Sequence, residues 1–164
     1  MGAVLDSGDH TGHISVFLVL PKIDPLKANY RKFSKYYDWF IAVFVFFMIY
    51  IHTLTIVWNR GIVFDMGLAI VPAMAALFYF VGVVLENAKQ NWFIGIRTPW
   101  TLSSEAVWEK TNKLGAKLFK ITAAAALFSA LLGAKAFGAV IFLLVGASLF
   151  LMIYSYLEFR KEKS

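Results

Sequence analysis

The sequence has no cysteine and only four prolines among its 164 residues. Without cysteine, neither a disulfide framework nor a thiolate metal site can form. The chain also lacks an HExxH string, a Ser-His-Asp order and a glycine-rich phosphate loop. We therefore expect a protein that is not an enzyme and has no catalytic residues, no metal site and no cofactor.

Charged residues are scarce, at 16% of the chain, whereas 60% of the residues are hydrophobic. A water-soluble domain of this size could not bury so much apolar surface. The apolar residues form four runs of about 20 residues, the length that a helix needs to cross a hydrocarbon core about 30 Å thick. In lipid the backbone must satisfy its own hydrogen bonds, so each run is expected to be a helix. The runs are Trp39–Trp58, Ile62–Leu85, Leu114–Ala134 and Ala136–Leu157.

This pattern predicts an all-α, polytopic integral membrane protein with four transmembrane helices in two hairpins. The turns near Arg60 and Lys135 are short, which makes the flanking helices antiparallel neighbours. An amphipathic helix near residues 103–113 is expected at the cytoplasmic interface, bending into the membrane at Gly115. The expected regions are a disordered polar tail at 1–13, a short apolar and then basic interfacial segment at 14–37, a transmembrane domain at 38–157 and a basic cytoplasmic tail at 158–164.

The basic residues predict the orientation. Along the chain they number five before the first run, one between the first and second, six from the end of the second run to Lys120 near the start of the third, one between the third and fourth, and three at the end of the chain. Because cytoplasmic loops retain Lys and Arg, residues 22–37, the 86–113 loop and the C-terminus are predicted to face the cytoplasm. The net charge of +6 then serves mainly to orient a multi-pass protein of the plasma membrane, with a secondary attraction to anionic lipid headgroups. Direct nucleic-acid binding is not expected.

The segment between the second and third runs is too long for a tight turn. Gly95 permits a positive φ or a close backbone approach. Pro99 favours an extended conformation at Thr98. Ser103 or Ser104 can cap a following helix. These features predict a defined loop rather than a featureless connection.

Arg97 is the most informative side chain of this loop. Its guanidinium has five donors and stays charged, so it can stack on an indole, bind a lipid phosphate or tie the loop to backbone carbonyls. The alternative is a simple interfacial anchor, because basic and aromatic residues gather at that depth. A polar patch where the second run ends either bonds this loop or meets water, and consists of Glu86, Asn87, Gln90 and Asn91.

His52 lies inside the first apolar run, where an ionisable group is costly and often functional. The alternative is a neutral histidine that bonds to a neighbouring helix. Together with Pro72 in the second run and small residues in the third, His52 supports a small transporter or channel subunit as an alternative function. A structural membrane subunit is a further alternative.

Four strings in this chain are unusual in composition, and one of them precedes the first apolar run. The strings are Asn91-x-Phe93-Ile94-Gly95-Ile96-Arg97-Thr98-Pro99-Trp100-Thr101-Leu102-Ser103, Val107-Trp108-x-x-Thr111-Asn112, Gly115-x-Lys117 and Pro21-Lys22-Ile23-Asp24-Pro25-Leu26-Lys27-Ala28-Asn29-Tyr30. Together they resemble the SdpI family of immunity proteins, and the resemblance covers roughly residues 16–157. The resemblance implies protection of a bacterium against its own secreted, membrane-active peptide toxin. It also implies a cytoplasmic transcriptional repressor held at the membrane.

The resemblance implies a binding site for a toxin or protein partner in the loop, and a homo-oligomer is compatible with it. Family members usually have two more spanning helices on the N-terminal side. In this chain Val16–Leu20 resembles only the cytoplasmic end of the second of these helices. Asn112 stands where relatives often have His, and because Asn does not titrate, a proton-linked role there is not expected. The candidate binding residues are Asn91, Gly95, Arg97, Thr98, Pro99, Trp100, Thr101, Trp108, Thr111 and Asn112.

Overall fold

The computed structural model describes residues 23–132 and 137–163. The expected tail at 1–13, the apolar segment before Pro21 and the turn near Lys135 lie outside these residues. The described residues contain helices and no strand, which confirms the all-α fold. The helices are α2 (Lys27–Asn59), α3 (Met66–Asn87), α4 (Pro99–Ser103), α5 (Glu105–Leu132) and α6 (Phe137–Lys163).

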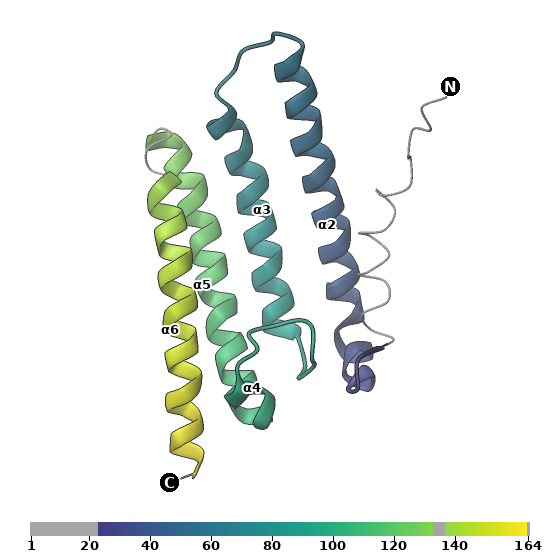
Figure 1. Ribbon diagram of the computed structural model, residues 1–164, viewed down its shortest axis with the longest axis vertical. Helices are drawn as coiled ribbons and strands as arrows, with labels where there is room; N and C mark the ends of the chain where they lie inside the picture. The colour runs from purple at the N-terminus through teal and green to yellow at the C-terminus, as the bar shows by residue number, and fades with distance from the viewer. Residues whose placement is uncertain (1–22, 133–136, 164) are drawn as a thin grey trace, which may run out of the picture.

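The long helices stand side by side in chain order, with α3 packed against α2 and α5, and α5 packed against α6 (Figure 1). The start of α2, the connection 88–104 with α4, and the end of α6 lie at one end of the molecule. The connection 60–65 lies at the opposite end. The segments that the basic residues assign to one side of a membrane therefore share one end, which we call the polar end.

Three described helical segments are long and apolar enough to cross a membrane, namely Lys27–Asn59, Met66–Asn87 and Val140–Lys163. They support a multi-pass membrane protein. The run expected at Leu114–Ala134 falls mostly in α5 and is not among these segments, and its last residues lie outside the described part of the chain. The fourth span therefore stays a prediction.

The helix boundaries at the polar end differ from the expected ones. α2 begins at Lys27, well before the apolar run, because the basic and aromatic segment is itself helical and buries Tyr30, Phe33 and Tyr37. The expected separate helix at 103–113 is wrong in its bounds. α4 ends at Ser103, and α5 then continues without interruption to Leu132.

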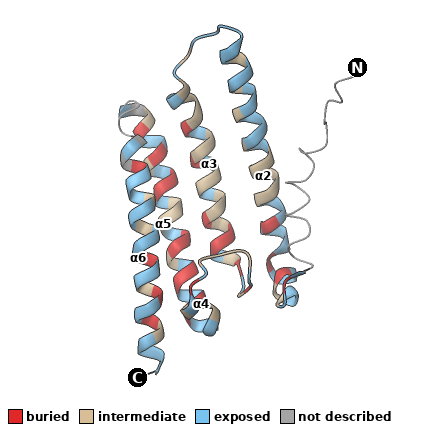
Figure 2. Cartoon of the chain, viewed as in Figure 1, coloured by how far each residue is buried: buried red, intermediate tan, exposed pale blue. Residues whose placement is uncertain are grey.

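Buried positions occur along the long helices (Figure 2), and among the described residues two clusters of buried apolar side chains pack together. At the polar end the cluster is aromatic, whereas between α3, α5 and α6 it is made of smaller side chains. The outer faces of α2 and α6 expose large apolar residues, as helices surrounded by lipid do. The polar-end cluster consists of Tyr30, Phe33, Tyr37, Ala88 and Trp108. The second cluster consists of Val71, Ala75, Ala126 and Val140.

Candidate functional site: the loop between α3 and α5

Asn91 organises the connection that follows α3, and it is fully buried. Its Nδ2 donates to the carbonyl oxygens of Lys89 and Ile94, at 2.8 and 2.7 Å. Its Oδ1 accepts from the backbone N–H groups of Phe93 and Ile94, at 2.9 and 2.6 Å. A buried polar atom left unpaired costs about 1–3 kcal/mol, so this saturated amide selects one conformation for the turn.

The start of α2 is fastened to the same turn. Asp24 is buried, and its carboxylate accepts from the backbone N–H groups of Leu26 and Trp92, at 2.6 and 2.8 Å. The Asn29 amide donates to the Gln90 carbonyl oxygen at 2.8 Å. The loop is thus held by a segment more than sixty residues earlier in the chain.

The loop lies against α5 through a close contact at Gly95. Its φ is 128°, and a Cβ there would lie 2.8 Å from the Trp108 ring and 2.9 Å from the Asn112 Oδ1. The Trp108 indole N–H donates to the Ala88 carbonyl oxygen at 3.0 Å. The Asn112 Oδ1 accepts from the Ile96 N–H at 2.9 Å. Only glycine therefore meets both the conformational and the steric demand.

A threonine pair closes the loop and begins α4. The Thr98 N–H donates to the Thr101 Oγ1 at 2.8 Å, and the Thr101 N–H donates to the Thr98 Oγ1 at 3.2 Å. Pro99 begins the helix, and Thr98 has the extended backbone that a following proline favours. The Thr98 hydroxyl also donates to the buried Ser155 Oγ at 3.0 Å, which links the loop to α6.

One ion pair joins α5 to α6 at the same end, and a second within α6 shares its carboxylate. The Lys110 ammonium lies 2.8 Å from the Glu158 carboxylate, which also contacts Lys161 at 2.7 Å. The hydrogen bond to Glu158 raises the pKa of Lys110, so this cation keeps its charge. Neighbouring Thr111 is fully buried, and its hydroxyl oxygen has no hydrogen-bond partner among the described residues.

The loop residues predicted from the sequence separate into an inner and an outer set. The outer set is exposed Arg97 and Pro99 with half-buried Gly95 and Trp100. The Trp100 ring lies 5.1 Å from that of Tyr156 on α6. The inner set is buried and consists of Asn91, Thr98, Thr101, Trp108, Thr111 and Asn112.

Arg97 donates to the Trp92 carbonyl oxygen, which corresponds to one of the alternatives considered for it, the tying of the loop to backbone carbonyls. Of the polar patch, Asn91 and Gln90 bond the loop, and the Gln90 amide donates to the carbonyl oxygens of Thr101 and Leu102, both at 2.9 Å. Asn87 instead donates to the Val83 carbonyl oxygen of its own helix, and Glu86 pairs with Lys120. His52 is not part of this site. It lies on an exposed face of α2, and no hydrogen bond to it occurs among the described residues.

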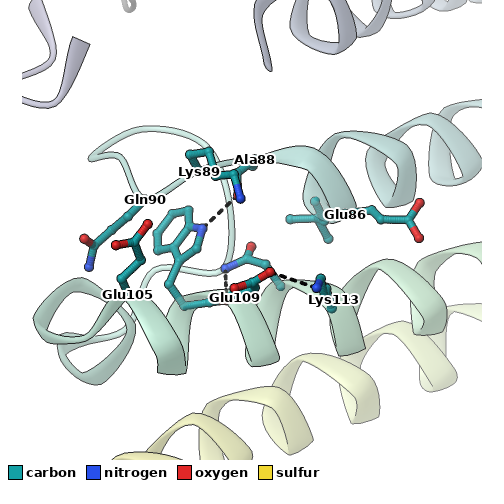
Figure 3. A pocket seen from close by; sticks show the side chains of 10 residues that line it. Glu86, Ala88, Lys89, Gln90, Glu105, Glu109 and Lys113 are labelled. Atoms are coloured by element: carbon teal, nitrogen blue, oxygen red, sulfur yellow. Dashed lines mark hydrogen bonds and ion pairs between the residues drawn. The ribbon is translucent and has the colours of Figure 1, made fainter. Parts of the chain in front are cut away.

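A cavity of about 20 Å³ lies between the end of α3 and the start of α5 (Figure 3). This volume holds about one water molecule and excludes a larger ligand. The Glu109 carboxylate on its wall lies 2.8 Å from the Lys113 ammonium, and this hydrogen bond lowers the pKa of Glu109. This cavity therefore cannot enclose a ligand larger than about one water molecule.

Sequence reasoning missed Asp24 and Ser155 as supports of the loop. A signal existed for Asp24, since an aspartate just before a proline and a helix is typical of a side chain that accepts backbone N–H bonds. No such signal existed for Ser155, whose role depends on the packing of α6 beside α4.

Comparison with known proteins agrees with the resemblance seen in the loop. The SdpI/YfhL protein family matches residues 87–155, which include the loop, α4, α5 and most of α6. The Immunity protein SdpI of Bacillus subtilis (strain 168) is 42% identical over 40 residues, which cover 24% of this chain and 19% of that protein. The match thus spans about a fifth of that relative. No solved structure matches this chain.

Replacing Gly95 by alanine tests the close contact between the loop and α5. We expect a loss of about 2–4 kcal/mol in the free energy of unfolding, from backbone strain and from crowding against Trp108. Gly61→Ala is the control, because Gly61 also has a positive φ, of 87°, but no neighbour within 4 Å. Unfolding in detergent, followed by tryptophan fluorescence, measures both. Equal losses would contradict the crowding.

Replacing Asn91 by aspartate tests the saturated amide. The variant lacks the donors to Lys89 and Ile94 and buries a charge, so we expect a loss of at least about 2 kcal/mol. Asn87→Asp is the control, since the half-buried Asn87 donates only to the Val83 carbonyl oxygen of its own helix. The same unfolding measurement applies. A variant at Asn91 as stable as the control would show that the turn does not need this amide.

Proposed function

We propose, from the match of residues 87–155 to the SdpI/YfhL protein family and the similarity to the Immunity protein SdpI, that this chain protects a cell membrane against a membrane-active peptide, recruits a cytoplasmic protein partner to the membrane, or does both. The relative in Bacillus subtilis carries the name of an immunity protein. The shared stretch covers only part of either chain, so the activity of the whole relative comes to this chain as a proposal.

The observation that supports this proposal is the rigid loop at the polar end. Its backbone and buried side chains are bonded to Asp24 and Asn29 at the start of α2, to Asn112 of α5 and to Ser155 of α6, while the side chains of Arg97 and Trp92 are exposed. A surface that is already ordered loses less conformational entropy when it binds a partner. Preorganisation of this kind favours recognition of a peptide or protein.

The proposed arrangement has four spans, with the polar end in the cytoplasm. The basic residues gather at that end, as they do on the cytoplasmic side of membrane proteins. In this arrangement α5 begins in the aqueous phase with Lys110 and Lys113 and then enters the bilayer. A cytoplasmic partner would reach the loop directly, whereas a peptide toxin would reach it through the membrane.

The absence of cysteine allows a direct test of this topology. Single cysteines at Arg60 and Lys135 should react with a membrane-impermeant maleimide on intact cells, because both turns are proposed to face outward. A cysteine at Lys89 should react only after permeabilisation. Labelling of the Arg60 variant but not the Lys135 variant on intact cells would contradict four spans.

Protection is tested by expressing the chain in a bacterial host that is sensitive to a membrane-active peptide toxin. We expect survival with the native chain, at least about tenfold lower survival with Arg97→Ala, and full protection with Lys89→Ala. Lys89 is a matched control because it is an exposed cation in the same loop. Membrane levels of each variant are measured in parallel.

The proposed function is contradicted if the native chain reaches the membrane but gives no protection and yields no crosslinked cytoplasmic partner. Equal effects of the Arg97 and Lys89 variants would instead reduce the loop to a patch of positive charge.

A further inference from the structure

The length of α2 places the loop outside the bilayer. The helix has 33 residues, which at 1.5 Å per residue make about 50 Å. The hydrocarbon core is about 30 Å thick, so about 20 Å of helix projects from it. The apolar run of α2 begins at Trp39, so the projecting part precedes this residue. Its cations are Lys27, Arg31, Lys32 and Lys35.

The projecting part of α2 belongs to a folded unit. It contributes Tyr30, Phe33 and Tyr37 to the aromatic cluster, to which Trp108 of α5 also belongs. Asp24 connects this unit to the loop through the Trp92 N–H. The polar end is therefore a small aqueous subdomain with its own core, standing on the spanning helices.

Two large apolar side chains are exposed on this subdomain. Ile23 is 57% exposed and Trp92 is 50% exposed. Their backbones are close, because Ile23 precedes Asp24, whose carboxylate accepts from the Trp92 N–H at 2.8 Å. Lipid covers the exposed apolar residues of the spans. The start of α2 lies about 20 Å beyond Trp39, which is outside the hydrocarbon core. These two side chains therefore need another cover.

Arg97 supplies a charge beside this apolar pair. Its guanidinium uses one N–H group on the Trp92 carbonyl oxygen, and the side chain is exposed. None of the ion pairs among the described residues involves Arg97. The nearby Asp24 carboxylate is buried and already accepts two backbone N–H bonds. The remaining guanidinium donors match a carboxylate from another molecule.

We infer that Ile23, Trp92 and Arg97, here called the Trp92 surface, dock an acidic amphipathic segment of a cytoplasmic protein. An apolar side chain of that segment covers Trp92 and Ile23, and a carboxylate pairs with Arg97. The inference rests on the proposed function and specifies the partner's chemistry. A membrane with anionic lipids is the competing occupant, which the projection of the subdomain disfavours.

The position of the Trp92 surface is measured first. A fluorophore on Ile23→Cys, with the full chain in nanodiscs that contain anionic lipid, should be quenched by aqueous iodide and not by lipids brominated on their acyl chains. A fluorophore on Ile153→Cys, an exposed residue within the apolar part of α6, is the control and should show the reverse. Quenching of the label at position 23 by brominated lipid would overturn the inference in favour of the membrane.

Partner chemistry is then measured with a defined probe, a synthetic amphipathic helix of leucine and glutamate, and its leucine–lysine counterpart. Binding to the full chain in neutral nanodiscs is followed by fluorescence anisotropy, with empty nanodiscs subtracted. We expect the glutamate peptide to bind at least about tenfold more tightly than the lysine peptide. Trp92→Ala and Arg97→Ala should each remove about tenfold of that affinity.

Lys113→Ala is the matched control, because Lys113 is an exposed cation of the same end that is paired with Glu109. It should leave peptide binding unchanged. Equal binding of the two peptides, or equal effects of the three variants, would overturn the docking surface. If the peptides fail to show this pattern but the chain still protects cells against the toxin, the docking surface is contradicted and the proposed function is not. If the glutamate peptide binds as expected but the chain gives neither protection nor a crosslinked cellular partner, the proposed function is contradicted and the docking surface is not.

Discussion

The contact of Gly95 with Trp108 and Asn112 determines the architecture of the polar end. A loop of this length would ordinarily sample many conformations, and ordering each residue costs about 1–2 kcal/mol. Here glycine lets the backbone approach the indole closely, and the Asn112 side chain accepts from the N–H of the following residue, Ile96. With the loop on α5, the Asn91 turn can meet α2. One close approach thus connects three helices.

The two clusters of buried residues reflect two solvents. Between lipid-surrounded helices there is no hydrophobic driving force, so close packing of small side chains holds them together. Val71, Ala75 and Ala126 have this character. In water, burial of aromatic surface is itself stabilising, at about 25 cal/mol per Å². Burial of Tyr30, Phe33 and Trp108 stabilises the polar end in this way. The change from large to small buried side chains along the bundle follows the proposed membrane boundary.

Hydropathy and short-range motifs predicted the all-α fold and the apolar parts of α2, α3 and α6, because burial in lipid depends on local composition. The motifs around Gly95, Thr98 and Pro99 also located the loop. They could not show that α5 begins at Glu105 as one helix, since a polar first half and an apolar second half look like separate elements. Nor could they show the bond from Asp24 to the Trp92 N–H, which joins distant segments.

The inner position of most loop residues changes how the long, unusual loop sequence should be interpreted. Thr98 and Thr101 bond to each other, and the Asn112 side chain accepts from the Ile96 N–H. These bonds leave few polar atoms of the three side chains for a partner. A substitution at such a residue would abolish binding by releasing the loop, even if no partner ever touched it. In the proposed function, recognition depends on the exposed side chains of Trp92 and Arg97. The inner residues hold Trp92 and Arg97 in fixed positions. The chemistry of these two side chains then determines which molecules the proposed surface can bind.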